Sequence, residues 1–249
     1  MLASAHRKAL EQWTWRSFMA TMVINQAVGP LIGLLVWSSV YQGDPVIRRY
    51  FFTLLITQLL TVSYEDHTLA TMIYRGHITH HLLLPQPVVI EMIGSSISLR
   101  FWHAIMGLPI MAVVGLSAGI ELDRTEVAAA VPALIVAGAI RFAFTTMIAS
   151  LAFWTEQARS LVNVANTLVF LLGGTVVPMF VLSDRISGIG QLLPFWSMLG
   201  FPSELAAGTV DSDRILGNYA VQAAWLVISI TCAVAVWHRG LRRYTAVGA

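Results

Sequence analysis

Charged residues are scarce in this sequence. Aspartate, glutamate, lysine and arginine make up 11% of the 249 residues, whereas hydrophobic residues make up 57%. A soluble globular domain carries roughly 25% charged residues, which cover its surface. The composition therefore excludes an ordinary soluble domain and indicates a chain solvated mostly by lipid.

Lysine and cysteine each occur only once. A P-loop needs a lysine behind a glycine-rich turn, whereas Lys8 follows Arg7. The chain therefore has no Walker-type ATPase site, and we expect it to bind no cofactor itself. Cys232 has no second cysteine to pair with, which excludes an intramolecular disulfide, and we expect it to be a small buried hydrophobe.

Concentrated basic patches are missing as well. The 15 basic residues are spread along the chain, and the formal net charge is only +2. A nucleic-acid groove needs a clustered basic surface, so no nucleic-acid partner is expected. The sequence contains no H-E-x-x-H, and its one G-x-S-x-G match, at residues 115–119, lies within an apolar stretch rather than at a strand-to-helix turn. Acyl transfer by a nucleophile elbow and metalloproteolysis are therefore not indicated.

Long apolar stretches are abundant instead. Six of them are long enough, or nearly so, to cross a hydrocarbon core of ~30 Å. The expected spans cover about residues 18–40, 50–70, 101–120, 127–153, 161–182 and 216–237. The sequence thus predicts an all-α integral membrane protein with six transmembrane helices, forming one domain over residues 1–249.

Three further segments complete the expected architecture. Residues 1–17 are interpreted as an amphipathic N-terminal segment, and residues 65–90 as a cytoplasmic segment between the second and third spans. Residues 183–215 are semi-apolar and rich in glycine and proline, which predicts short external re-entrant helices between spans five and six.

Basic residues set the expected orientation, because cytoplasmic loops retain lysine and arginine during insertion. With the N-terminus inside, nine basic residues lie on the cytoplasmic side and five outside, while Arg141 falls within the fourth span. The nine are Arg7, Lys8, Arg16, Arg75, Arg100, Arg159, Arg239, Arg242 and Arg243, and the five are Arg48, Arg49, Arg124, Arg185 and Arg214. We therefore expect both termini in the cytoplasm.

The cytoplasmic segment carries a helical pattern. Leu69, Met72, Ile73 and Gly76 fall at i, i+3, i+4 and i+7, and the prolines that follow end the pattern. The spacing predicts a short amphipathic helix around residues 69–84. It either rests on lipid headgroups or fits a groove on a soluble partner, and spacing alone does not choose between these roles.

A histidine cluster follows in the same segment. His77, His80 and His81 form H-x-x-H-H, a box that membrane di-iron enzymes use for metal binding. Such enzymes need about eight histidines in several boxes, whereas this chain has seven histidines and one box. A membrane metalloenzyme is therefore one hypothesis, and a basic surface face without metal is the other.

Ionisable residues at membrane depth suggest another class of function. Glu65, Asp66 and Arg141 could serve a proton-coupled secondary transporter, since such groups often carry protons or substrate. Arg141 lies near the middle of the fourth span, where an unpaired charge costs at least ~2.5 kcal/mol. It either pairs with a carboxylate or carbonyls within the bundle or contacts substrate.

Two stretches resemble the ABC-2 type permease family. The first, after the second span, resembles the family's G-x-[ILT]-x-x-L-L-x-[PT]-P segment at Gly76, Ile78, Leu82, Leu83, Leu84 and Pro85, with one extra residue between Ile78 and Leu82. The second is similar to the family's fifth span and external helices at Phe153, Trp154, Gly173, Gly174, Pro178, Leu193, Pro194, Phe195, Pro202 and Gly208. The triple histidine departs from the pattern, because many members carry small polar or basic residues there.

This resemblance implies the membrane subunit of an ATP-driven exporter in a prokaryotic inner membrane. Such a subunit dimerises with itself or a related permease and binds separate cytoplasmic ATPase subunits, which hold the ATP and magnesium. The ATPase-coupling candidates are Arg75, Gly76, Ile78, Leu82, Leu83, Leu84 and Pro85. The chain is then no enzyme by itself, and the substrate stays open among amphiphilic drugs, peptides, lipids and glycans.

The resemblance also places the translocation path between two protomers, along spans one, two and five. Polar residues on these spans are then candidates for the path, with helix packing as the alternative for each. The candidates are Asn25, Gln26, Gln58, Asn163 and Asn166.

Overall fold

The computed structural model describes residues 16–155 and 158–244, so the amphipathic segment expected over residues 1–17 lies almost wholly outside the described residues. The regular structure of the described residues is helical throughout. The long helices are α2 (Arg16–Val40), α3 (Pro45–Thr61), α6 (Val88–Ser117), α7 (Arg124–Ser150), α8 (Ala158–Leu172) and α11 (Ile215–Arg243). The short ones are α4 (Glu65–Tyr74), α5 (Ile78–Leu82), α9 (Asp184–Gln191), α10 (Phe201–Ala207), the 3₁₀ turns η1 (Leu151–Phe153) and η2 (Met179–Val181), and the π-helical turn η3 (Trp196–Gly200).

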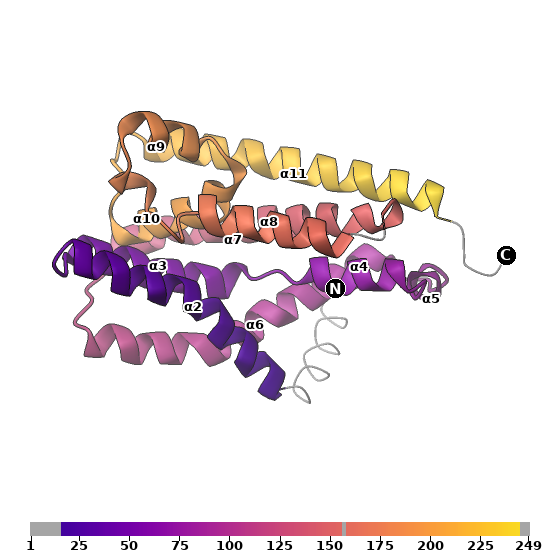
Figure 1. Cartoon of the computed structure of the whole chain (residues 1–249), viewed down its shortest axis with the longest axis horizontal. Coiled ribbons are helices and arrows are strands. Elements are labelled where there is room, and N and C mark those ends of the chain that lie inside the picture. Colours follow the sequence, from indigo (N-terminus) through magenta and orange to yellow (C-terminus); the bar gives the residue numbers. More distant parts are fainter. Residues whose placement is uncertain (1–15, 156–157, 245–249) are drawn as a thin grey trace.

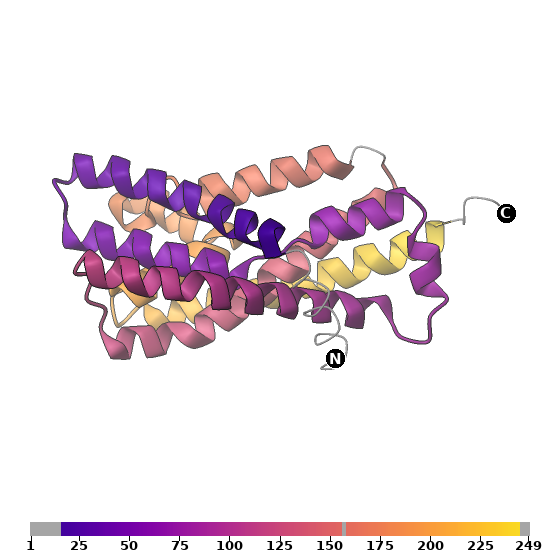
Figure 2. The same cartoon turned by 90° about the horizontal axis from the view of Figure 1, so that it is seen from below.

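The long helices run roughly along one axis of an elongated bundle (Figure 1). Helices α4 and α5 lie with the C-terminal end of α11 at one end, which we call the α5 end, and α9 and α10 lie at the other. Both views place α2 and α8 on the same side of the bundle (Figure 2), which we call the α2–α8 face.

Four helical stretches among the described residues are long and apolar enough to cross a membrane. They are Thr21–Val40, Val88–Ser117, Arg124–Phe153 and Ile215–Arg243. The apolar stretch Ser160–Leu172 is shorter, and α3 has 17 residues. An integral membrane protein is therefore supported, with four of the six expected spans long enough by themselves.

Aspartate caps begin two of the long helices. The Asp44 side chain accepts a hydrogen bond from the Val46 amide at 2.7 Å, and Pro45 occupies the first turn of α3. Asp123 accepts one from the Thr125 amide at 2.7 Å at the start of α7. Both caps satisfy amides that have no partner within the helix.

Two expected helix boundaries were wrong. The second span was predicted to continue to about residue 70, but α3 ends at Thr61 and Val62 is extended. The third was predicted to begin near residue 101, but α6 already begins at Val88, after Pro87. A carboxylate in the first turn, Glu91, complements the positive end of the helix dipole and makes this earlier start favourable.

Arg100 consequently lies inside a long apolar helix, and its assignment to a cytoplasmic loop was wrong. Its Nε donates to the carbonyl of Val62 at 3.0 Å, and one of its terminal nitrogens donates to that of Gly138 at 2.7 Å. Without Arg100, eight basic residues instead of nine are expected on the cytoplasmic side, against five outside. The guanidinium satisfies a carbonyl at the point where α3 has ended, so it stabilises the break.

Helix α3 is the core of the bundle. Tyr50, Phe51 and Leu54 have no exposed surface. The Tyr50 hydroxyl donates to the Gly174 carbonyl at 2.8 Å, which fixes the segment after α8 against α3. Gly174 has a φ of +89°, and a Cβ there would come within 2.2 Å of the Tyr50 hydroxyl oxygen, so only glycine fits.

Helices α7 and α11 pack closely through small residues. Ala133 and Ala137 on α7 are fully buried, and small side chains let two helix backbones approach in a membrane. Gln222 on α11 is also fully buried, and its Nε2 donates to the carbonyls of Ala133 and Ser197 at 2.9 and 3.0 Å. This side chain joins α11 to both α7 and η3.

Cys232 was expected to be buried, but it is exposed on α11. The buried positions of this helix include Ser229, Ala233, Trp237 and Gly240, which follow the helical period. Cys232 lies beside that stripe rather than on it. In a membrane helix an exposed position meets lipid, which accepts a small apolar thiol as readily as a protein core does.

A carboxylate is buried at the end of the bundle away from α5. Glu204 on α10 has 3% of its surface exposed and faces Trp196 and the backbone of Met179. Burial raises the pKa of Glu204 from an ordinary value of 4.5 to about 8, although these two neighbours oppose the shift. Glu204 is therefore neutral at pH 7 in the folded protein.

Replacing this group should change how stability depends on pH. The folded pKa of Glu204 lies above the unfolded value, so its contribution is fully present below pH 4.5 and is lost as the pH rises towards 8. The loss approaches about 1.4 kcal/mol per pH unit. Thermal unfolding between about pH 5 and about pH 8 is therefore expected to show Glu204→Gln gaining stability relative to wild type as the pH rises. Glu121→Gln, at an exposed carboxylate, is the control, and a constant difference across this range contradicts a neutral Glu204.

Candidate functional site

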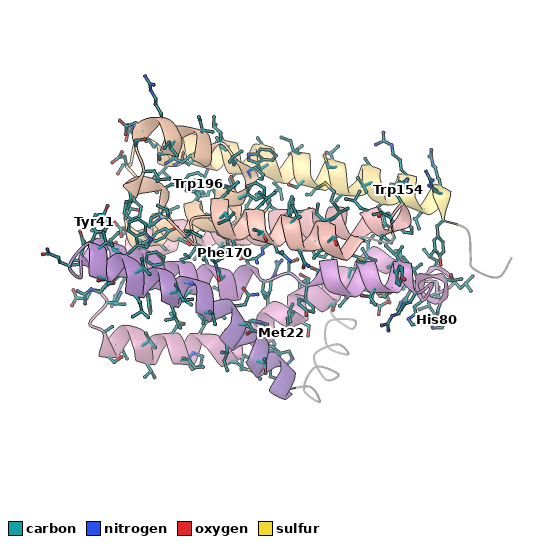
Figure 3. All side chains as sticks on the ribbon, viewed as in Figure 1. Met22, Tyr41, His80, Trp154, Phe170 and Trp196 are labelled. Atoms are coloured by element: carbon teal, nitrogen blue, oxygen red, sulfur yellow. The ribbon has the colours of Figure 1, made fainter. Side chains whose placement is uncertain are left out.

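A cavity of about 400 Å³ opens among α2, α3, α7 and α8. Its polar lining side chains come from all four helices and from the segments that follow α3 and α8. They are Asn25, Gln26, Gln58, Ser63, Tyr64, Arg141, Asn166 and Thr175. We call this cavity the polar pocket; it lies on the α2–α8 face, where Phe170 on α8 marks one wall (Figure 3).

The polar pocket brings together most of the residues proposed for the path. Asn25, Gln26, Gln58 and Asn166 line it, and so does Arg141. Asn163 is outside the lining. It is exposed on α8 three residues before Asn166, and therefore about 4.5 Å further along the helix axis.

Sequence reasoning missed several lining residues. Ser63 and Tyr64 reach the pocket because α3 ends at Thr61, which the periodicity of the apolar stretch did not reveal. Thr175 follows the Gly173–Gly174 pair, and its Oγ1 accepts a hydrogen bond from Gln58 Nε2 at 3.0 Å. The glycine pair in the sequence could have indicated Thr175, because glycines permit a sharp turn after an apolar helix, and such a turn places the next side chain against the bundle.

A glycine on α2 sets the width of this pocket. A Cβ at Gly29 would lie 3.0 Å from the Phe170 ring and 3.1 Å from the Thr175 methyl group. Contacts this short require the neighbours to move, so a larger residue would separate α2 from α8 and the Thr175 segment. Gly29 therefore keeps the two walls close.

Arg141 supplies the charge of the pocket. It is half-buried on α7, and one terminal nitrogen donates to Thr61 Oγ1 at 3.4 Å. Among the described side chains that line the pocket, it is the one that carries a formal charge at neutral pH. Its guanidinium stays protonated at any working pH. Arg141 therefore gives the lining of the pocket a positively charged side chain.

Glu65 belongs to a polar network that adjoins the pocket and includes two of its lining residues, Ser63 and Tyr64. Its carboxylate accepts hydrogen bonds from the Ser63 hydroxyl, from the Tyr64 amide at 3.0 Å and from Thr145 Oγ1 at 3.4 Å. Burial raises the pKa of Glu65, and the hydrogen bond from Ser63 opposes that shift. These contacts fix the loop between α3 and α4, which carries two of the lining residues.

The segment at the α5 end folds as two helices, so the single helix expected around residues 69–84 was wrong. Helix α4 ends at Tyr74, and Gly76 has a φ of +73° before α5 begins at Ile78. Such a backbone angle interrupts a right-handed helix and favours glycine. The expected apolar face is present in α4, since Leu69 and Ile73 are 1% and 4% exposed.

Most of the candidate coupling residues are exposed, whereas one of them is buried. Arg75 and Pro85 are exposed, and Leu82, Leu83 and Leu84 are exposed by 39%, 81% and 44%. Ile78 is fully buried in a cluster with Leu69, Ile73 and Trp237, so it cannot contact a partner directly.

The end of α11 holds α5 in place. The hydroxyls of Tyr244 and Thr79 are 2.9 Å apart, and the Tyr244 hydroxyl also lies 3.4 Å from the Gly76 carbonyl. Together with the burial of Ile78, these contacts present the apolar tip of residues 82–84 on a fixed support.

The histidine box does not form a cluster of ligands in the described part of the chain. Nδ1 of His81 lies 2.9 Å from a carboxylate oxygen of Glu91, while His77 and His80 are exposed. His80 lies at the α5 end (Figure 3). No group of three or more His, Cys, Asp or Glu side chains among the described residues is arranged to hold a metal ion. The exposure of His77 and His80 places these two side chains on the surface of the segment.

Comparison with known proteins identifies one family. A family profile described as ABC-2 family transporter protein matches residues 9–248, which is nearly the whole chain. Searches of curated proteins and of solved structures find no match.

Cysteine labelling can test whether the polar pocket is open to water. In a Cys232→Ala background, Asn25→Cys and Asn166→Cys are expected to react with a membrane-impermeant maleimide in native membranes. Ile110→Cys, at an exposed apolar position on α6 away from the pocket, is the control and should react at least about tenfold more slowly, because thiol reactivity requires access to water. Equal rates at all three positions would show that the pocket is not specifically hydrated.

Proposed function

The chain belongs to the ABC-2 transporter family and is therefore a membrane transporter subunit, and on that premise we propose that it is the permease of an ATP-driven exporter. The polar pocket is the central part of its translocation path. Supporting this is the convergence of four path candidates and Arg141 on one cavity lined by four helices. A partner ATPase supplies the energy, because the chain's single lysine is not part of a P-loop.

The substrate class follows from the chemistry of the pocket. Arg141 offers planar donors for a carboxylate or phosphate. Apolar side chains such as Val28, Ile32 and Phe170 line the same cavity and suit an apolar tail. We therefore propose an amphiphile with an anionic head as the exported substrate. Of the drugs, peptides, lipids and glycans that the sequence left open as substrates, this proposal keeps the anionic ones.

Substitutions of Arg141 test this substrate class. In the complex with its ATPase, Arg141→Gln is expected to reduce transport of a fluorescent fatty acid by about tenfold or more, since a hydrogen bond to a charged group contributes ~1.5–3 kcal/mol. Arg141→Lys should restore part of that loss because it keeps the charge. Transport of the corresponding neutral amide should change little.

Arg185→Gln on α9 is the control, because Arg185 is exposed and outside the polar pocket. If Arg141→Gln instead lowers the thermal stability strongly and impairs both probes equally, Arg141 has a packing role. Equal transport of the fatty acid by all variants contradicts the proposed anionic substrate.

The apolar tip at the α5 end is the proposed contact with the ATPase. Leu83 is 81% exposed. Helix α5 is held in place by the burial of Ile78 and by the hydrogen bond between the hydroxyls of Tyr244 and Thr79. A leucine knob on a rigid short helix suits a groove on a soluble partner, which is one of the recurring modes of helix recognition.

Reversing the polarity of this knob should uncouple the two subunits. Leu83→Glu is expected to reduce substrate-stimulated ATPase activity and co-purification of the ATPase by about tenfold, because a buried carboxylate would have no partner at the contact. Leu216→Glu is the matched control: Leu216 is also 81% exposed but lies in the first turn of α11, at the opposite end from α5. If both variants keep full coupling, the tip does not dock on the ATPase.

The remaining architecture is proposed as a six-span subunit that dimerises. Helices α3 and α8 are the two shorter spans, α9 and α10 re-enter from outside, and the α5 end with both termini faces the cytoplasm of an inner membrane. The α2–α8 face exposes Ile24, Leu35 and Val164 by 65%, 72% and 57%. A second permease, identical or related, would cover this face and close the polar pocket.

A further inference from the structure

A second cavity lies outside the proposed path. It has a volume of about 600 Å³ and is bounded by α6, α7 and α11. Its walls are largely apolar and include Val89, Ile93, Phe142, Ile230 and Val234. Among the described side chains, none from α2 or α8 lines it. We call it the lateral cavity, and the exporter function proposed above does not use it.

The lateral cavity is elongated along the helices. Its lining begins at Pro87 beside the start of α6 and extends to Arg100 on the same helix. A rise of 1.5 Å per residue makes this stretch about 20 Å long. One leaflet of a bilayer has a hydrocarbon depth of about 15 Å. The cavity therefore has the length of an acyl chain inserted from one membrane surface.

Two basic residues of α11 lie at and just beyond the end of the cavity near the membrane surface. His238 and Trp237 line it there, and Arg242 lies one helical turn beyond His238 on α11. No described residue that lines the cavity carries a carboxylate. Glu91, on the first turns of α6, is engaged by His81 instead. The charge at this mouth is therefore complementary to an anion.

The deep end of the cavity is closed by Arg100. This guanidinium donates to the carbonyls of Val62 and Gly138, so it acts in the structure of the bundle. The chemistry thus differs between the two ends. The surface end is basic, and the interior is apolar and ends at a polar group that bonds to two carbonyls.

We propose that the lateral cavity binds one anionic phospholipid. An acyl chain fills the space among α6, α7 and α11, and the phosphate lies beside His238 and Arg242. Basic pockets between transmembrane helices near a membrane surface recognise anionic headgroups in this way. A pocket of this volume also falls in the range of about 300–1,000 Å³ that is typical of ligand sites.

The competing occupant, a second copy of the chain, fits this face less well. A helix partner needs a continuous apolar surface, whereas this site is a cavity of about 600 Å³ with a basic end. The α2–α8 face exposes apolar side chains such as Ile24, Leu35 and Val164. A lipid, in contrast, is present wherever the protein is embedded and matches the cavity in length, polarity and charge.

Lipid retention by the purified full-length chain tests the site. The chain is equilibrated with mixed micelles of equal phosphatidylglycerol and phosphatidylcholine, and bound lipid is measured by native mass spectrometry. Wild type is expected to retain about one phosphatidylglycerol per chain. Arg242→Gln should lower the preference for phosphatidylglycerol about fivefold, as expected for one basic group near the membrane surface. Adding His238→Gln should lower it further.

Two further variants separate this site from general effects. Arg243→Gln removes the same charge from the adjacent position, but Arg243 lines a different cavity with Tyr74 and Phe153, so the preference should be unchanged. Ala139→Phe places a ring in the lateral cavity from its α7 wall and should displace the lipid while the protein keeps its thermal stability.

Three results would overturn the proposal. The first is an equal loss of preference in Arg242→Gln and Arg243→Gln, which indicates a diffuse surface charge. The second is undiminished lipid retention in Ala139→Phe. The third is efficient disulfide cross-linking between two copies through Val234→Cys in a Cys232→Ala background, which makes this face a protein interface. Each readout is independent of transport, so the exporter proposal can fail while this site stands.

Discussion

The guanidinium of Arg100 holds the bundle together where its backbone is interrupted. In lipid, a carbonyl released by a helix end has no water to bind, so the bundle must satisfy it internally. Arg100 donates to the Val62 carbonyl just after α3 ends and to the Gly138 carbonyl on α7. It thereby allows a break between α3 and α4 among packed helices. Ser63 and Tyr64 reach the polar pocket because of that break.

Two arginines at membrane depth consequently have different tasks. Arg100 faces carbonyls and closes the inner end of the lateral cavity. Arg141 lines the polar pocket, with a 3.4 Å contact to Thr61 as a support from α3. The same residue type bonds to backbone carbonyls at one position and lines a cavity at the other. Desolvation makes both placements costly unless the charge has such neighbours.

The two cavities give the two sides of the bundle separate chemistry. The polar pocket opens between α2 and α8, where amides and hydroxyls gather and a second permease is proposed. The lateral cavity is apolar except at its basic mouth and suits a lipid. Helix α7 contributes to both, so it lies at the centre of the proposed mechanism as α3 lies at the centre of the packing. Substrate passage and lipid contact can therefore occur without competing for one surface.

The amino-acid sequence alone determined the class of protein, because scarcity of charge and long apolar stretches leave few alternatives to a helical membrane bundle. Resemblance of short motifs also indicated the ABC-2 family, which the family profile confirms, and made Leu82, Leu83 and Leu84 coupling candidates, which the structure leaves exposed. Only the tertiary structure decided that α3 stops at Thr61, that Ile78 is buried and Cys232 exposed, and that Arg100 lies within α6. Periodicity reports which face of a helix is apolar, whereas these features depend on neighbours distant in the chain. The meeting of Asn25, Gln58, Arg141 and Asn166 in one pocket has the same cause.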